Sequence, residues 1–322
     1  MIRRPATTLT ILLAGAMLAG CLRAPEDEYR DAVPRSEELS VEVPGSGGEG
    51  SAGRASAPVV GERADFYQLT RDTSRGVNGT LWVTLAILHH VVSYPATEVH
   101  EDHAVWGPWT ETLSPITYKL IVERVETGHY RYVLQGKPRA EGDEAFVDLL
   151  GGETEVDDEA GVKRGTIGYN IDAAHALDEG EHPYRGRIAA SWDAGASPRV
   201  VEAGFEGIFN ERGEGPVEAL YRYRENVDGS GSFEFGMRAD IANDGSLAED
   251  VVIMTRWDAS GAGRGDAIIQ GGDAGGEVVY ANECWDASFD RTYWVDTHDI
   301  QPNEGDSGAC PYSEPLWSEM SM

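Results

Sequence analysis

Residues 217–241 have the sequence VEALYRYRENVDGSGSFEFGMRADI, and their pattern decides the fold. Apolar and polar residues alternate in each half, which is the period of a β-strand with one buried face. Asp228 and Gly229 separate the two halves, and this dipeptide favours a tight turn between antiparallel strands. The segment therefore predicts a hairpin that buries an aromatic face, including Tyr221, Phe233 and Phe235, and exposes a charged face to solvent.

Alternating segments of this kind occupy most of the chain after Pro115. Turn-forming Gly, Asn, Asp and Pro residues separate them, as expected for short strands joined by tight turns. The expected strands begin near Tyr118 and Tyr130 and continue at 145–150, 164–170, 185–193, 199–209, 217–225, 232–241, 249–258, 265–270, 277–283 and 291–296. We therefore expect a mainly β fold: an antiparallel up-and-down sheet of about 12 strands, curled into an open barrel or half-barrel that buries the apolar faces.

The tripeptide Trp-Asp-Ala occurs at residues 192–194, 257–259 and 285–287. The distances in sequence between successive copies differ, so the tripeptide does not mark the regular blades of a propeller. We expect each copy to end a strand, with the Trp packed in the core and the Asp accepting hydrogen bonds within a turn.

One strong helix precedes the strands. Val77, Leu81, Leu85, Leu88 and Val92 recur at helical spacing, and Pro95 stops the pattern. The other faces of this helix are also apolar, through Trp82, Val83, Ala86, Ile87 and Val91. We expect the helix to be buried nearly all round between Leu81 and Val92, wrapped by the concave face of the sheet, since the strands provide the only large apolar surface.

The N-terminus has the features of a secretory signal peptide. Arg3 and Arg4 precede an apolar run from Leu9 to Leu18, which is too short to span a bilayer. The run ends in LAGC at residues 18–21, which resembles the lipobox of bacterial lipoproteins. That resemblance implies cleavage before Cys21 and a diacylglycerol group, with acyl chains such as palmitate, on the N-terminal cysteine. The alternative is an ordinary secreted protein in which Cys21 is incidental.

The resemblance also bears on location and domain organisation. In bacterial lipoproteins, an Asp after the cysteine tends to retain the protein at the inner membrane, and Leu22 therefore favours the outer membrane. We expect residues 1–20 to be the signal peptide, 21–62 to be the lipidated N-terminus and a disordered linker, and 63–322 to form a single β-rich domain. The lipid anchor is the expected membrane contact, and the side on which the body lies, periplasm or exterior, stays open.

The chain is strongly acidic, with a formal charge of −30 that becomes −32 without residues 1–20. This charge and the absence of a basic cluster argue against nucleic acid as a partner. Lysine is scarce, with only Lys119, Lys137 and Lys163. Acidity with scarce lysine also occurs in proteins adapted to salt. The charge is therefore compatible with adaptation to a salty environment as well as with a function.

Two cysteines remain once Cys21 is acylated. Cys284 and Cys310 form an even pair, and an exported protein folds in an oxidising compartment, so we expect a disulfide between them. A zinc site would need two further ligands near these cysteines, and the sequence offers none.

Residues 305–308, GDSG, resemble the nucleophile motif of chymotrypsin-type serine proteases. The segments that end in His175 and begin with Asp240 resemble the other two parts of that triad, and their order matches the family. Too few residues follow Ser307 for the family's substrate pocket, and Ala309 replaces a motif glycine. We therefore assign no catalytic residue and keep an envelope serine hydrolase as the alternative function.

Two segments contain residues of the types that commonly serve as metal ligands. Asn226, Asp228 and Ser230 place oxygens as in the first half of an EF-hand loop, but Met237 stands where the loop needs a glutamate. Acidic loops leave open a weak structural calcium site, and no other cofactor is expected. The segment from His100 to His103 is compact enough for a transition metal, although a solvated loop is the plainer interpretation.

The residues favour a binding or structural interaction module of the cell envelope over an enzyme. If space remains beside the helix, the residues expected to line it are Trp82, Tyr118, Tyr132, Phe233 and Phe235, and a hydrophobic ligand would fit there. A barrel that holds a helix in its mouth resembles the periplasmic carriers of lipoproteins and lipids, which is a resemblance of architecture alone.

Overall fold

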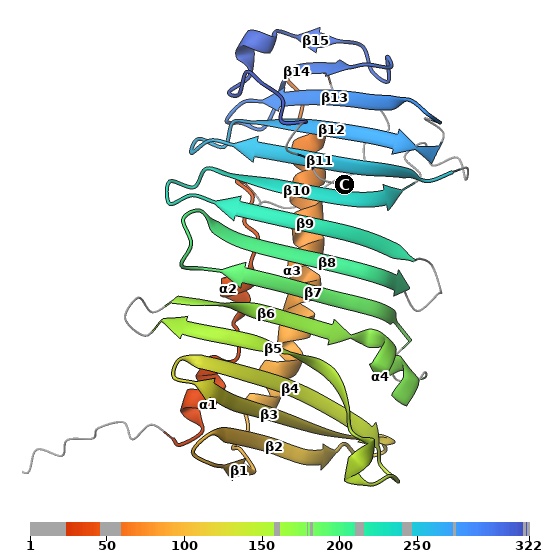
Figure 1. Ribbon diagram of the computed structural model, residues 1–322. Helices are drawn as coiled ribbons and strands as arrows, with labels where there is room; N and C mark the ends of the chain where they lie inside the picture. Colours follow the sequence, from red (N-terminus) through yellow and green to blue (C-terminus); the bar gives the residue numbers. More distant parts are fainter. Residues whose placement is uncertain are drawn as a thin grey trace, which may run out of the picture.

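The computed structural model describes residues 24–45, 59–157, 162–178, 180, 183–209, 216–239, 247–272, 275–317 and 320. Its 15 strands form one sheet in which every strand pairs antiparallel with its neighbours in sequence (Figure 1). The expected mainly β, up-and-down architecture is therefore confirmed. The sheet is not closed into a barrel, because β1 and β15 are its two edges.

The strands are β1 Glu98–Val99, β2 His103–Thr110, β3 Ile116–Glu126, β4 His129–Pro138, β5 Val147–Asp157, β6 Val162–Asn170, β7 Arg185–Asp193, β8 Arg199–Phe209, β9 Val217–Glu225, β10 Gly231–Ala239, β11 Glu249–Trp257, β12 Gly263–Gly271, β13 Val278–Trp285, β14 Arg291–Asp296 and β15 Glu304–Gly305. The α-helices are α1 Asp27–Ala32, α2 Ser36–Leu39, α3 Asp65–Val92 and α4 Ile171–Leu177. Short 3-10 helices, η1 and η3, span Asp143–Ala145 and Ser307–Ala309.

Four expected strands, β7, β8, β9 and β14, have the bounds that the sequence predicts. The strand number of about 12 was too low, because β1, β2 and β15 were not expected. Strand β2 contains Pro108 between Trp106 and Trp109, although proline usually interrupts strand pairing. A β-bulge between Trp106 and Trp109 accommodates Pro108 within β2.

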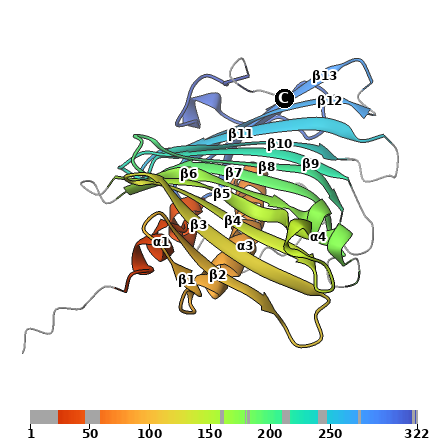
Figure 2. The same cartoon turned by 60° about the horizontal axis from the view of Figure 1, so that its bottom comes forward.

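Helix α3 lies along one face of the sheet, called here the inner face (Figures 1 and 2). Near its start, the rings of Phe66 and Trp294 in β14 are 5.4 Å apart. Just past its end, the Trp106 indole in β2 donates to the Tyr94 carbonyl. Twelve strand spacings separate β2 from β14, about 58 Å along a sheet, whereas a helix of 28 residues is about 42 Å long. The sheet is therefore coiled rather than flat.

The expectation that the helix is buried nearly all round between Leu81 and Val92 is wrong. Leu81, Leu85 and Leu88 are at most 2% exposed, but Trp82 is 60% exposed and Val83 is 55% exposed. The sheet covers one side of α3 and residues 24–45 cover another, which leaves one apolar side of the helix without cover by the described residues.

Residues 24–45 also differ from the expectation, which placed them in a disordered linker. They contain α1 and α2 and bury Tyr29, Val33 and Leu39 against the core. The Tyr29 hydroxyl donates to the carbonyls of His100 and Glu101. The composition of this segment is poor in apolar residues, but those few are enough to fasten it beside α3.

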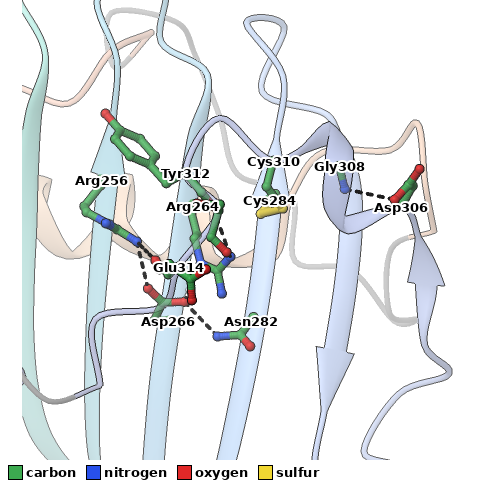
Figure 3. The surroundings of a disulfide bond; sticks show 11 residues. Arg256, Arg264, Asp266, Asn282, Cys284, Asp306, Gly308, Cys310, Tyr312 and Glu314 are labelled. Atoms are coloured by element: carbon green, nitrogen blue, oxygen red, sulfur yellow. Dashed lines mark hydrogen bonds and ion pairs between the residues drawn. A yellow bond between two sulfur atoms is a disulfide. The ribbon is translucent and has the colours of Figure 1, made fainter.

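The opposite, outer face of the sheet carries the C-terminal segment. Cys284 in β13 and Cys310 form a disulfide (Figure 3), as the sequence predicted. Beyond Cys310 the chain crosses a buried network in which Asp266 accepts from Arg264 at 2.7 Å and from Asn282 at 2.7 Å. The carbonyl of Tyr312 accepts from Arg264, so the disulfide holds a segment that covers these buried charges.

Three tryptophans occupy similar places in the sheet, each within two residues of the end of a strand and opposite a glycine of the paired strand. The pairs are Trp192 with Gly165, Trp257 with Gly231 and Trp285 with Gly263. The Asp after each Trp accepts backbone hydrogen bonds within the following turn. The expectation for the Trp-Asp-Ala tripeptide is therefore confirmed, and the missing Cβ of each glycine makes room for the indole ring.

Candidate functional site

A pocket of about 450 Å³ lies between the C-terminal half of α3 and the first strands of the sheet. Its volume is in the range of small-molecule sites, and its lining is mostly apolar. The helix contributes Trp82, Val83, Ala86, Ile87, His90 and Val91, and the sheet with α4 contributes Trp109, Glu111, Tyr118, Leu134, Leu149, Tyr169 and Ala174.

The helical side of the pocket is the uncovered side of α3. Trp82, Val83, Ala86, Ile87 and His90 follow one another at a spacing that places them on one helix face. The large apolar side chains of Trp82 and Val83 are both more than half exposed. Adjacent exposed side chains of this kind form a contiguous apolar patch, which often marks a binding surface. The face is therefore suited to contact with another apolar molecule.

The β-bulge in β2 builds the opposite wall. Gly107 has a φ of +102°, and a Cβ there would lie 2.8 Å from the Trp109 ring. The extra residue of the bulge brings Trp109 to the inner face, where it pairs with Tyr118 of β3. The rings of Trp109 and Tyr118 are 5.7 Å apart and tilted by 32°, and both side chains are only partly buried.

An apolar row extends from the pocket along the inner face. The strand register aligns Tyr169 of β6 with Ile188, Phe205, Ala219, Met237, Val251 and Ile269 of the following strands. Burial raises the pKa of Tyr169, since no charged group compensates for its loss of hydration. Phe205, Met237 and Ile269 are partly buried against the core, so the row continues the apolar surface beyond the pocket.

Among the described lining residues, two side chains besides the tyrosines are ionisable. His90 and Glu111 are both exposed. Neither Lys nor Arg is among the described lining residues. The described lining therefore combines aromatic rings and aliphatic side chains with one imidazole and one carboxylate.

The structure brings two of the five expected ligand-binding residues to this pocket, namely Trp82 and Tyr118. Tyr132, Phe233 and Phe235 are instead fully buried. The Tyr132 hydroxyl donates to the Thr166 carbonyl, which explains how the phenol is accommodated in the core. Sequence reasoning missed Trp109 and Tyr169, and the Gly-Pro pair before Trp109 is the signal that could have indicated the bulge.

The serine-protease motifs do not assemble. His175 lies in α4, which packs on β4, β5 and β7, whereas Ser307 lies in η3 beside β14. The strands β7 and β14 are seven positions apart in the sheet, which corresponds to about 34 Å along it. Asp240 lies outside the described residues. His175 and Ser307 are therefore not partners.

The expected calcium ligands form a hairpin turn between β9 and β10. Asp228 accepts from the backbone and hydroxyl of Ser230, and Asn226 donates to the Ser230 hydroxyl. These hydrogen bonds lower the pKa of Asp228. In the described part of the chain, no group of three or more His, Cys, Asp and Glu residues is placed to hold a metal. His100 and His103 stack in the β1–β2 hairpin with ring centroids 4.4 Å apart.

Other hollows are less suited to a hydrophobic ligand. A hollow of about 670 Å³ lies on the outer face, with a floor that includes Gly151, Gly168 and Ala189 and a wall that carries the Arg131–Glu153 ion pair. A hollow of about 500 Å³ is lined by residues of strands β8 to β12. Another of about 480 Å³ lies between α2 and α3. The described lining of each includes glycine and two or more charged side chains, whereas that of the pocket beside Trp109 and Tyr118 includes no glycine and one carboxylate.

Comparisons with protein-family models, curated proteins and solved structures found no match for this chain. Within the described residues, no helix has the length and apolar character needed to cross a membrane.

Proposed function

We propose that this protein is a lipid-anchored component of the bacterial outer membrane whose folded body binds a hydrophobic ligand between α3 and strands β2–β6. One observation carries the proposal: Trp82 and Val83 are more than half exposed beside a pocket lined by Trp109, Tyr118 and Tyr169. An apolar ligand that covered these side chains would gain about 25 cal/mol for each Å² removed from water. In this proposal the coiled sheet acts as an open half-barrel around α3.

The position of α1 supports access to a membrane. Arg30 of α1 donates to the carbonyl of Val92, next to Val91 in the pocket wall. The six residue-to-residue steps from Cys21 to Asp27 extend at most about 21 Å. A lipid on Cys21 would therefore hold the β1–β4 end of the body, which carries the pocket, close to the membrane surface. A ligand with an acyl chain is then available next to the site.

The test is binding of N-phenyl-1-naphthylamine, an uncharged apolar dye whose fluorescence rises in apolar surroundings. Ala86→Trp adds a large ring inside the pocket, and we expect it to abolish dye binding. Val227→Trp adds the same ring at a side chain that is 98% exposed in the β9–β10 turn, and we expect it to preserve binding. Unchanged dye binding by Ala86→Trp would contradict the proposed site, and no binding by the native protein would favour a purely structural module.

A further inference from the structure

Glu111 is the one carboxylate among the described lining residues of the pocket, and neither Lys nor Arg is among them. Glu111, the residue that follows β2, is exposed, and the described residues give its carboxylate neither an ion-pair nor a hydrogen-bond partner. Two carboxylates at the opposite end of these strands differ: Glu28 pairs with Arg124 at 2.9 Å, and Glu153 pairs with Arg131 at 3.0 Å. The Glu111 carboxylate is thus available to a ligand that carries positive charge.

The aromatic residues of the same pocket favour the same charge. The face of an indole or phenol ring attracts a cation through its quadrupole, most strongly for tryptophan. Trp82, Trp109 and Tyr118 all line the pocket, with the last two rings 5.7 Å apart. An ammonium group with apolar substituents would contact these rings and Glu111 together, whereas a carboxylate or phosphate would meet no Lys or Arg of the lining.

We propose that the pocket selects amphiphiles with an ammonium head group. The head group lies between Glu111 and the rings of Trp109 and Tyr118, and the alkyl chain follows the apolar row that begins at Tyr169. This selectivity rests on the proposed hydrophobic site and adds a ligand class to it. The formal charge of −30 opposes anionic amphiphiles at longer range.

Three amphiphiles with the same dodecyl chain test the hydrophobic site and its ammonium selectivity separately. Dodecyltrimethylammonium, dodecyl maltoside and dodecanoate, each below its micelle concentration and at 0.15 M salt, are titrated against the bound dye. We expect the cationic compound to bind at least about tenfold more tightly than the uncharged one, and dodecanoate to bind most weakly. Equal affinities would overturn the ammonium selectivity alone, whereas failure of dodecyl maltoside to displace the dye would contradict the hydrophobic site itself.

Matched variants locate the selectivity. Glu111→Gln should reduce the preference for the cationic over the uncharged compound by about threefold or more, with the affinity for dodecyl maltoside unchanged. Glu123→Gln removes the same charge from an exposed residue of β3 outside the pocket lining and should leave the preference intact. An equal loss in both variants would show that net charge alone favours cations and would overturn the assignment to Glu111.

Discussion

At the scale of single residues, the sheet depends on positions where a missing side chain makes room for a large one. A Cβ on Gly263 would lie 2.3 Å from the Trp285 ring and 2.5 Å from the Arg256 carbonyl oxygen. Trp285 is 1% exposed and donates from its indole nitrogen to the Gly261 carbonyl, so the ring has little freedom to move. The glycine is required by this close approach.

Gly263→Ala should therefore destabilise the protein by about 1–3 kcal/mol, the usual effect of overpacking. The measurement is the free energy of unfolding in urea. Gly204→Ala is the matched control, because a Cβ on Gly204 would have no atom within 4 Å and should change stability by less than about 1 kcal/mol. Equal effects at the two sites would contradict the role assigned to the Trp–Gly pairs.

The carboxylate of Glu283 in β13 is buried against the start of α3. It is fully buried and accepts from the backbone nitrogens of Asp65 and Phe66 and from the Arg291 guanidinium. Burial raises the pKa of Glu283 to about 7, and the Arg291 charge opposes that rise only in part. Because the folded protein retains this proton to a higher pH than the unfolded chain, the contribution of Glu283 to stability falls as the pH rises from about 4.5 to 7.

We predict that this fall, of up to about 3 kcal/mol, disappears in Glu283→Gln. Arg291 keeps its contacts with Asp65 and Gln301 in that variant. The measurement is the urea midpoint of both proteins between pH 5 and pH 8. The two pH profiles should diverge across this range, and parallel profiles would contradict the prediction.

At the scale of elements, α3 has two apolar faces with different surroundings. Leu85 is 1% exposed between the sheet and the N-terminal segment, whereas Trp82 is 60% exposed beside the pocket. The contribution of a side chain to folding stability follows the apolar surface that it buries. Trp82 is therefore expected to contribute less to the free energy of folding than the smaller Leu85.

Leu85→Ala should cost about 2–5 kcal/mol in free energy of unfolding, as a large-to-small change in a core does. Trp82→Ala should cost less than about 1 kcal/mol, since its removal leaves no internal cavity, and it should weaken binding of the apolar dye. Chemical denaturation and dye titration of both variants check this contrast. A larger loss of stability for Trp82→Ala would show that the exposed face of α3 is part of the core.

At the scale of the whole molecule, the proposed lipid anchor can be tested separately from the fold. The described body begins at residue 24, three residues after Cys21, and none of its helices qualifies as a membrane span. In the proposed function, the lipid on Cys21 attaches the protein to the membrane.

Cys21→Ser should therefore yield unprocessed or soluble protein with an unchanged fold. Cell fractionation and metabolic labelling with a radioactive fatty acid measure attachment, and circular dichroism checks the fold. Membrane-bound, lipid-labelled protein from this variant would refute the anchor.

The sequence by itself determined most of the sheet. Alternation in segments such as 185–193 and 217–225 predicted their bounds, because the period of two depends only on neighbouring residues and on a turn such as Asp228-Gly229. Helical spacing likewise predicted that α3 ends before Pro95. The disulfide followed from counting cysteines.

Only the tertiary structure decided which apolar residues are buried and which stay available to a ligand. Leu81 and Trp82 are equally apolar neighbours, yet one is covered by the core and the other borders the pocket. That difference depends on residues 24–45, which return to lie beside α3, and on the bulge that turns Trp109 to the inner face. Both are contacts between segments distant in the chain, and no local period records them.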